Sequence, residues 1–339
     1  MNRIRVGIIG AGRIGRVHAQ SIAFGIPEAE IVAISDPFIE NAERAARDFA
    51  IPAIYPDYHA ILNDPTIQAV LICSPTNTHA DIAMEAARAG KHIFCEKPVD
   101  QTVSKILETK KLVEENAVKM QIGFNRRFDH NFRKIKKLRD DGTLGEIQII
   151  RITSRDPEPP SPEYAKTSGG MFLDMTIHDF DMACYQANSE VDEVYAMGAV
   201  TVDPEIGKAG DIDTAIVTLK FKNGAMAVID NCRKAVYGYD QRVEVFGTNG
   251  AAASENDRET MVKISTKDAV CEDKPLFFFL ERYMQSFRDE IKSFINAILN
   301  DRPVEVNIDD GLRPILIAIA ANKSMKENRP VKISEVMEG

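Results

Sequence analysis

The stretch RVGIIGAGRIG (residues 5–15) decides the fold of the first part of the chain. Its apolar run predicts a strand that ends at Gly10, and the residues after the glycines predict a helix. Gly10 allows the tight turn, Gly12 lets a pyrophosphate approach the main chain, and Gly15 lets the helix pack closely on the strand. The free N–H groups at the start of that helix attract an anion. The spacing therefore predicts the dinucleotide-binding turn of a Rossmann unit.

Asp36 is the acidic partner expected for this turn. It ends the apolar stretch Glu30–Asp36, 21 residues after Gly15. A carboxylate at this place accepts hydrogen bonds from the adenosine ribose hydroxyls and would repel a 2′-phosphate. Pro37 and Phe38 follow, with no adjacent arginine to hold such a phosphate. The sequence thus favours NAD over NADP, while a glycine-rich corner with a capping aspartate stays the alternative.

The first third of the chain alternates strand and helix patterns, which is typical of an α/β fold with a doubly wound parallel sheet. Further strands are expected at residues 68–74, 91–96 and 118–124, and helices at 41–50, 79–90 and 104–115. After residue 125 the pattern changes to segments that alternate with a period of two. Helices in this second part are expected at residues 129–140, 281–300 and 311–327.

The second part predicts an α+β domain with an open, mainly antiparallel sheet. Two hairpins are expected, at residues 214–232 and 241–256. We place the boundary after residue 124, which gives an NAD-binding domain (1–124) and a substrate-binding and oligomerisation domain (125–339). The last helix is a candidate for packing back on the first domain.

The composition limits the class of protein. The 339 residues carry a formal net charge of −9, which argues against a general nucleic-acid binder. The five cysteines form no C-x-x-C pair, so neither a zinc site nor a disulfide framework is expected, and a cytoplasmic location fits. No apolar run approaches the roughly 20 residues of a membrane span. The first residues show no signal-peptide pattern.

A lysine follows the strand expected at residues 91–96. In open α/β sheets ligands bind beyond the carboxyl ends of strands, and Lys97 in CEKP (residues 95–98) lies at such an end. Its ammonium group can stabilise developing alkoxide character, although a surface lysine is the plainer interpretation. The loop SPTNTH (residues 74–79) is a similar strand exit. The further residues expected beside the cofactor are Arg13, Ile14, Ser74, Thr76, Asn77, His79 and Glu96.

The stretch SGGMFLDMTIHDFDMACY (residues 168–185) places charged residues among apolar ones. If it is helical, Asp174 and His178 lie four apart on one face, close enough to hydrogen-bond. A carboxylate beside an imidazole fixes its orientation, which makes His178 a candidate proton acceptor. One alternative is a helix start capped by Asp174 with a satisfied histidine. A divalent metal site is the other, and we expect none because Lys97 can polarise the oxygen.

These residues together resemble a known family. GAGRIG, EKP and the stretch SRDPEPPSPEYAKTSGGMFLDMTIHDFDMA (residues 154–183) make the chain similar to the glucose–fructose oxidoreductase/inositol dehydrogenase (Gfo/Idh/MocA) superfamily over nearly its whole length. The long stretch most resembles the bacterial inositol 2-dehydrogenase branch, whereas EKP is shared across the superfamily. The resemblance implies NAD-dependent oxidation of a ring hydroxyl of a cyclic polyol, with myo-inositol giving 2-keto-myo-inositol (scyllo-inosose).

The same resemblance implies roles for individual residues. Lys97, Asp174 and His178 match the family's catalytic lysine, aspartate and histidine. His178 would take the hydroxyl proton, Asp174 would assist that transfer, and Lys97 would hold the oxygen. The substrate-pocket positions that it implies are Arg127, Asp156 and Tyr237, with Tyr239 and Tyr283 as alternatives for the tyrosine. Family members are often tetramers built through the open face of the second sheet, so a homotetramer is implied.

Other functions stay open at this point. The same scaffold and triad serve dehydrogenases of scyllo-inositol, other cyclitols and pyranose sugars. A non-catalytic NAD-binding sensor is an alternative from another class, because fold alone does not decide function. The presence of Lys97, Asp174 and His178 together argues against a sensor, which has no need of a proton acceptor.

Overall fold

The computed structural model describes residues 3–337, which form two compact units. The first unit holds the residues through Phe128 together with Met284–Ile315, and the second holds Asp129–Tyr283 and the residues from Leu316 onward. The chain therefore passes between the units at three places, whereas the sequence suggests a single boundary after residue 124. Within the described residues, no helix has the length and apolar character needed to cross a membrane.

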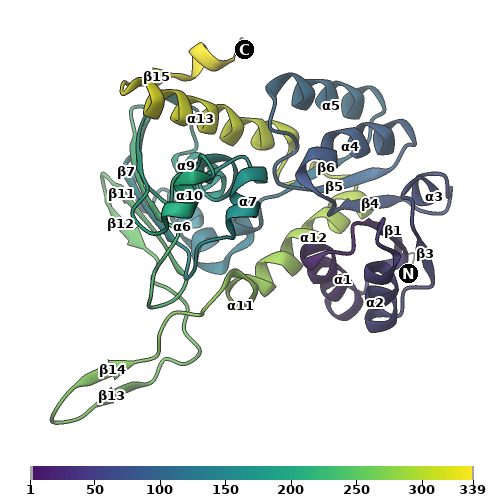
Figure 1. Ribbon diagram of the computed structural model, residues 1–339, viewed down its shortest axis with the longest axis horizontal. Helices are drawn as coiled ribbons and strands as arrows, with labels where there is room; N and C mark the ends of the chain where they lie inside the picture. Colours follow the sequence, from purple (N-terminus) through teal and green to yellow (C-terminus); the bar gives the residue numbers. More distant parts are fainter. Residues whose placement is uncertain (1–2, 338–339) are drawn as a thin grey trace. The chain divides into compact units, whose positions relative to one another are not determined.

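The first unit is built on a six-stranded sheet with the order β3-β2-β1-β4-β5-β6, in which all neighbouring strands are parallel (Figure 1). The strands are β1 (Ile4–Ile9), β2 (Ala29–Ser35), β3 (Ala53–Tyr55), β4 (Ala69–Ile72), β5 (His92–Glu96) and β6 (Met120–Gly123). β4 and β6 consist of buried residues only, as expected of strands in a sheet that is covered on both faces. The strand order reverses between β1 and β4, where doubly wound sheets form a ligand crevice.

Helices complete the core of the first unit. They are α1 (Arg13–Gly25), α2 (Ile39–Phe49), α3 (His59–Leu62), α4 (His79–Arg88), α5 (Val103–Glu115) and α12 (Met284–Leu299), with the 3-10 turns η1 (Thr76–Thr78) and η2 (Asn125–Phe128). α12 comes from late in the chain and lies beside α1 (Figure 1). Its residues Ile291, Phe294 and Ile295 pack in one core with residues of β1, β2, β4 and α1. The apolar spacing of three or four residues gives this helix its buried face.

The second unit is built on a seven-stranded sheet with the order β12-β11-β7-β10-β9-β8-β15. Its strands are β7 (Ile147–Arg155), β8 (Val191–Ala199), β9 (Thr214–Phe221), β10 (Met226–Cys232), β11 (Asp240–Gly247), β12 (Gly250–Ala253) and β15 (Val331–Lys332). Only β7 and β10 pair in parallel among the described strands of this sheet. Buried and exposed residues alternate along β9, so one face of the sheet is packed and the other is open. The fold class predicted from the sequence is confirmed.

Several short helices accompany this sheet. They are α6 (His130–Asp140), α7 (Pro162–Thr167), α8 (Met171–Asp174), α9 (Ile177–Ala187), α10 (Pro204–Lys208), α11 (Phe279–Arg282) and η3 (Ile333–Val336). α9 packs against β7, and α13 (Ile308–Glu327) contributes residues to both units. A separate hairpin, β13 (Lys263–Ser265) and β14 (Val270–Glu272), extends as an exposed arm that the sequence did not predict (Figure 1).

Candidate active site

The glycine turn (Gly10–Gly15) joins β1 to α1 with the geometry that a G-x-G-x-x-G motif requires. Gly10 has a φ of +100°, and a Cβ atom there would lie 2.6 Å from the main-chain oxygen of Cys73. A Cβ atom on Gly15 would lie 2.0 Å from the Gly10 oxygen, so a side chain would push α1 away from β1. At Gly12, by contrast, no atom lies within 4 Å of the Cβ position. The turn is thus tight where the helix packs and open where a pyrophosphate approaches, which fits a dinucleotide.

Asp36 directly follows β2, and its carboxylate is hydrogen-bonded to the main chain of the glycine turn. It is 8% exposed, and its Oδ2 accepts a hydrogen bond from the Ala11 N–H at 2.9 Å. Its Oδ1 accepts another from the Phe38 N–H, also at 2.9 Å. The carboxylate therefore has the capping role that the sequence left open. Since each carboxylate oxygen can accept two hydrogen bonds, capping still leaves acceptor capacity for ribose hydroxyls.

The loop after β4 is tied to the residues that follow β5. His79 begins α4 and is 2% exposed. Its Nδ1 lies 2.7 Å from the carbonyl oxygen of Pro98, and its Nε2 lies 2.8 Å from the carbonyl oxygen of Ser74. The imidazole thus holds the two loops together through main-chain groups, which is a structural role. Thr76 is half-buried and Asn77 is exposed, so these two loop side chains are better placed to meet a ligand.

Lys97 directly follows Glu96, the last residue of β5. The Lys97 side chain is half-buried, while Glu96 is buried with its Oε1 2.6 Å from Nε2 of His18. Arg127 lies in η2 and is also buried, with its Nη2 3.2 Å from Oδ1 of Asp310. Glu96 and Arg127 are therefore held inside the first unit by specific partners.

Asp156 and Asp174, here called the acidic pair, share a buried arginine in the second unit. Arg233 follows β10 and is 3% exposed. Its Nη1 lies 3.6 Å from Oδ2 of Asp156, and its Nη2 lies 3.3 Å from Oδ2 of Asp174. Tyr164 donates its hydroxyl to Oδ1 of Asp174 at 2.9 Å. A planar guanidinium between two carboxylates compensates their charge and fixes their positions.

Sequence reasoning missed Arg233, although the strand ends carried a signal. β7 and β10 are parallel neighbours in which Arg155 lies opposite Cys232. Asp156 and Arg233 are the next residues of the two strands, so they leave the sheet at the same edge. Both are charged residues directly after a strand, which is the signal. The local pattern does not say which distant strands pair, and for that reason it could not join these two residues.

The segment that contains His178 forms two short helices rather than one. α8 ends at Asp174 and α9 begins three residues later, so a helix break separates Asp174 from His178. His178 is half-buried in the first turn of α9. Asp179 and Asp181 are 0% and 1% exposed, and Asn231 donates its amide to Oδ2 of Asp179 at 2.8 Å. The acidic residues after His178 therefore belong to the core of the second unit.

The three tyrosines proposed as alternatives differ in exposure. Tyr237 is 39% exposed, donates its hydroxyl to Oδ2 of Asp240 at 2.6 Å and accepts a hydrogen bond from Nη1 of Arg155 at 3.1 Å. Burial and the bond to Asp240 raise the pKa of Tyr237. Tyr239 and Tyr283 are 6% and 1% exposed, and their rings pack edge to face with centroids 6.0 Å apart. Of the three, Tyr237 presents the accessible side chain.

Comparisons with known proteins show which family the two parts of the chain resemble. Residues 4–124 match the model of the oxidoreductase family with an NAD-binding Rossmann fold, and residues 132–253 match that of the GFO/IDH/MocA C-terminal domain. The uncharacterized oxidoreductase YrbE of Bacillus subtilis is 53% identical to the chain, over 98% of this chain and 97% of its own. Myo-inositol 2-dehydrogenase of Thermotoga maritima is 47% identical, over 98% of this chain and 100% of its own.

A solved structure with a bound cofactor is also similar. Scyllo-inositol dehydrogenase from Lactobacillus casei, with bound NAD(H) and scyllo-inositol, superposes with a TM-score of 0.92 at 32% identity and covers 98% of this chain and 100% of that chain. The family resemblance and the NAD cofactor expected from the sequence are both confirmed. The chain belongs to the Gfo/Idh/MocA family and is an NAD-dependent oxidoreductase.

Proposed function

We propose that the protein oxidises a ring hydroxyl of a cyclic polyol with NAD, and that its main substrate is myo-inositol, which gives 2-keto-myo-inositol. The observation that carries the proposal is the 47% identity, over 98% of this chain, to a myo-inositol 2-dehydrogenase. The acidic pair supports it, because carboxylates accept hydrogen bonds from the several hydroxyls of such a ring. Its fixed position beside Arg233 suits recognition of a rigid ring.

The proposed chemistry gives each residue one role. NAD, when bound, accepts the hydride from the carbon that carries the hydroxyl. His178 takes the hydroxyl proton, and Asp174 orients the reacting groups. Lys97 donates a hydrogen bond to the same oxygen and stabilises the negative charge that develops on it. Arg127 and Tyr237, together with Asp156, are proposed to bind the other hydroxyls.

The proposed cofactor site follows the glycine turn and the strand ends of the first unit. Main-chain N–H groups at the start of α1 hold the pyrophosphate, and Asp36 holds the adenosine ribose. The charge of Asp36 also disfavours NADP. The residues proposed to contact or frame NAD are Gly10, Gly12, Arg13, Ile14, Gly15, Asp36, Ser74, Thr76, Asn77, His79 and Glu96.

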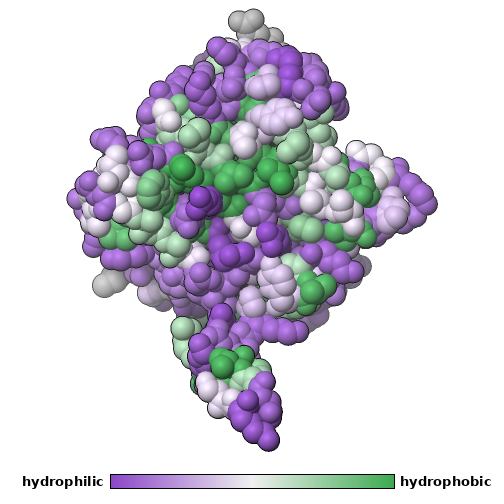
Figure 2. All heavy atoms as spheres, turned by 90° about the vertical axis from the view of Figure 1, so that its left-hand side faces the viewer, coloured by the Kyte–Doolittle hydropathy of each residue, from purple (hydrophilic) through white to green (hydrophobic). Residues whose placement is uncertain are grey.

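We also propose that the protein is a homotetramer that assembles through the open face of the second sheet. The outward residues Met197, Ile216, Met226 and Phe246, on four of its strands, are between 43% and 54% exposed. Figure 2 shows this side of the molecule, where apolar side chains gather in the middle. Exposed apolar patches of this kind mark protein interfaces. Sedimentation should give a tetramer for the wild type and smaller species for Ile216→Glu. We place the tetramer in the cytoplasm, where the thiols of its five cysteines stay reduced.

The direct test is NADH formation with myo-inositol, scyllo-inositol and D-glucose, each offered with NAD and with NADP. The proposal expects the highest kcat/KM with myo-inositol and NAD. A faster reaction with scyllo-inositol or glucose would change the substrate and leave the reaction class intact. If no polyol is oxidised although NADH binds, the proposed reaction is wrong.

A further inference from the structure

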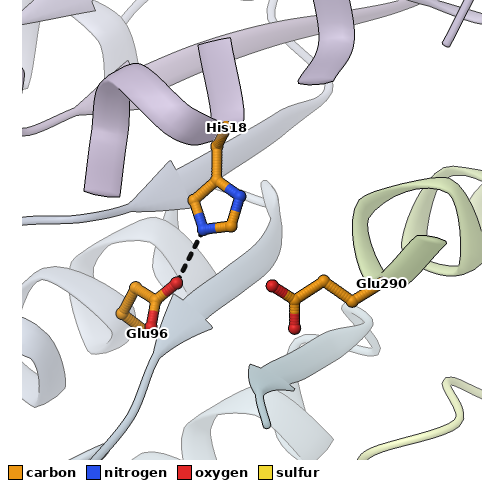
Figure 3. Close-up of side chains that lie close together, drawn as sticks. All are labelled: His18, Glu96 and Glu290. Carbon is orange, nitrogen blue, oxygen red and sulfur yellow. Dashed lines mark hydrogen bonds and ion pairs between the residues drawn. The ribbon is translucent and has the colours of Figure 1, made fainter. Parts of the chain in front are cut away.

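Three side chains from separate elements of the first unit lie close together at the end of β5, the strand that precedes Lys97. His18 comes from α1, Glu96 ends β5, and Glu290 comes from α12 (Figure 3). One nitrogen or oxygen atom from each lies within 4.8 Å of those of the other two. We call these three residues the buried triad. Glu290 has no part in the function proposed above.

The buried triad lies in an apolar environment. His18 and Glu290 are 0% exposed, and Glu96 is 8% exposed. The His18 ring makes edge contacts with Phe94 and Phe287, with ring centroids 5.1 Å and 5.8 Å apart. Solvent is excluded from such a place, so a charge there needs a partner or has to be neutralised.

Glu290 has no such partner. Both of its carboxyl oxygens are buried and make no hydrogen bond with any residue in the described part of the chain. The carboxyl group points toward His18 and Glu96 (Figure 3). Gln121 reaches only the main chain of Glu290, where its Nε2 donates to the carbonyl oxygen at 2.8 Å. An ionised Glu290 would therefore be an uncompensated charge beside a second carboxylate.

The charged group that acts most strongly on Glu290 is the carboxylate of Glu96. α12 packs against α1 and β5, which bring His18 and Glu96, and against η2, which brings Arg126 and Arg127. Arg127 already pairs with Asp310. Burial, and next to it the charge of Glu96, raise the pKa of Glu290 well above its ordinary range. Burial and the nearby carboxylate of Glu96 thus both favour the protonated form of Glu290.

Two features favour a proton rather than a metal ion among these groups. The 2.6 Å between Nε2 of His18 and Oε1 of Glu96 is a hydrogen-bond distance, so one hydrogen lies between these two atoms. A histidine that binds a metal usually donates its other ring N–H to a carboxylate, a carbonyl or water. Nδ1 of His18 is buried and has no hydrogen-bond partner among residues 3–337. This arrangement suits a neutral imidazole with its hydrogen on Nε2.

We propose that the buried triad is a proton-binding site in which Glu290 holds the proton and Glu96 alone is ionised, and that Glu96, fixed by His18, positions the strand end from which Lys97 acts. The absence of a side chain at Gly123 leaves room for the carboxyl group of Glu96 in this position. Gly123 lies opposite Glu96 on β6, and a Cβ atom there would lie 3.1 Å from Oε2 of Glu96. Only the part about Lys97 rests on the proposed function.

Infrared spectroscopy tests the proton directly. At neutral pH, the wild-type spectrum minus that of Glu290→Gln should contain the carbonyl stretch of one protonated carboxyl group. Asp289→Asn is the matched control, since Asp289 precedes Glu290 on α12 but is only partly buried and accepts a hydrogen bond from Gln285. That control should show no such band. Absence of the band from wild type, or one divalent ion per chain that Glu290→Gln loses, would overturn the proposal.

The pH dependence of stability provides a second test that needs no turnover. Because the folded state holds the Glu290 proton more tightly than the unfolded state, its stabilising effect is complete at low pH and is lost as the pH rises. Relative to Glu290→Gln, the folding constant of wild type should fall by up to about tenfold per pH unit above about pH 5. If Glu290→Gln does not fold, Glu290→Met replaces it as the non-titrating variant. A constant ratio between pH 5 and pH 8 contradicts the proton site.

Kinetics test the positioning part. Glu96→Gln should lower kcat by about tenfold to a hundredfold through a displaced Lys97, a larger factor than its change in the Kd for NADH. Glu290→Gln keeps a neutral group of the same shape, so its kcat should stay within about twofold of wild type. If Glu96→Gln instead weakens NADH and leaves kcat intact, Glu96 binds the cofactor and does not position Lys97. If wild type itself is inactive, the spectroscopic and stability results still decide the proton site.

Discussion

The glycine turn of the first unit is made of main-chain groups that lie within the first 36 residues, whereas the acidic pair of the second unit depends on an arginine from a distant strand. In the first region, glycines without side chains leave space that suits an anionic cofactor, and Asp36 is the one acidic residue beside it. In the second, a buried cation holds two anions. Local spacing is thus enough to form the turn proposed to bind the cofactor, whereas tertiary pairing is needed to fix the two carboxylates proposed to bind the substrate.

The largest effect is expected from Lys97→Ala, which tests whether the first unit supplies chemistry as well as cofactor binding. Loss of the ammonium group should lower kcat by about a hundredfold to a thousandfold, because charge on the oxygen is no longer stabilised. NADH binding, followed by fluorescence titration, should change little. Wild-type turnover in this variant would show that Lys97 takes no part in the reaction.

Arg233→Met is expected to have the next largest effect and tests the second region. It leaves Asp156 and Asp174 without their shared cation, so the free energy of unfolding should fall by about 3 kcal/mol. Denaturant unfolding followed by circular dichroism measures this loss. Arg233→Lys keeps the charge without the planar fork, and its stability should lie between wild type and Arg233→Met. Equal stability of all three proteins would mean that the arginine does not hold the acidic pair.

Two variants of Asp36 test how the first unit binds NAD and how it discriminates against NADP. Asp36→Ala removes two hydrogen bonds to main-chain N–H groups, so KM for NAD should rise by about tenfold. Asp36→Asn keeps an acceptor oxygen but removes the charge, and should narrow the preference for NAD over NADP with a smaller rise in KM. Steady-state kinetics with both cofactors distinguish the two effects. An unchanged preference in Asp36→Asn would show that the carboxylate charge does not exclude NADP.

The smallest effect is expected from Tyr237→Phe. The variant loses the hydrogen bonds of the hydroxyl to Asp240 and Arg155 but keeps the ring, so the free energy of unfolding should fall by about 1 kcal/mol. If Tyr237 also contacts the polyol, its KM should rise by about twofold to fivefold. Tyr239→Phe is the control, because that ring is buried. A rise in KM for the polyol only in Tyr239→Phe would reverse the assignment.

The sequence predicted those features that depend on local spacing. The alternation of strands and helices, the glycine turn, Asp36 and the hairpin around Lys222–Gly224 all follow from residues near one another in the chain. Arg233 and Glu290 could not be found in this way. The first needs the pairing of β7 with β10, and the second lies on the apolar face of α12, where spacing indicates only core. The break between α8 and α9 was likewise invisible, since the apolar pattern continues through it.

The place of α12 in the first unit has a consequence for synthesis of the protein. The core of that unit needs Ile291, Phe294 and Ile295, which leave the ribosome after nearly all of the second unit. In many chains with several domains, the N-terminal domain folds before the next one is made. The first unit of this protein cannot complete its core in that order. Until α12 has been made, the apolar surface of α1 that it covers stays exposed, so we expect the nascent chain to need protection from aggregation.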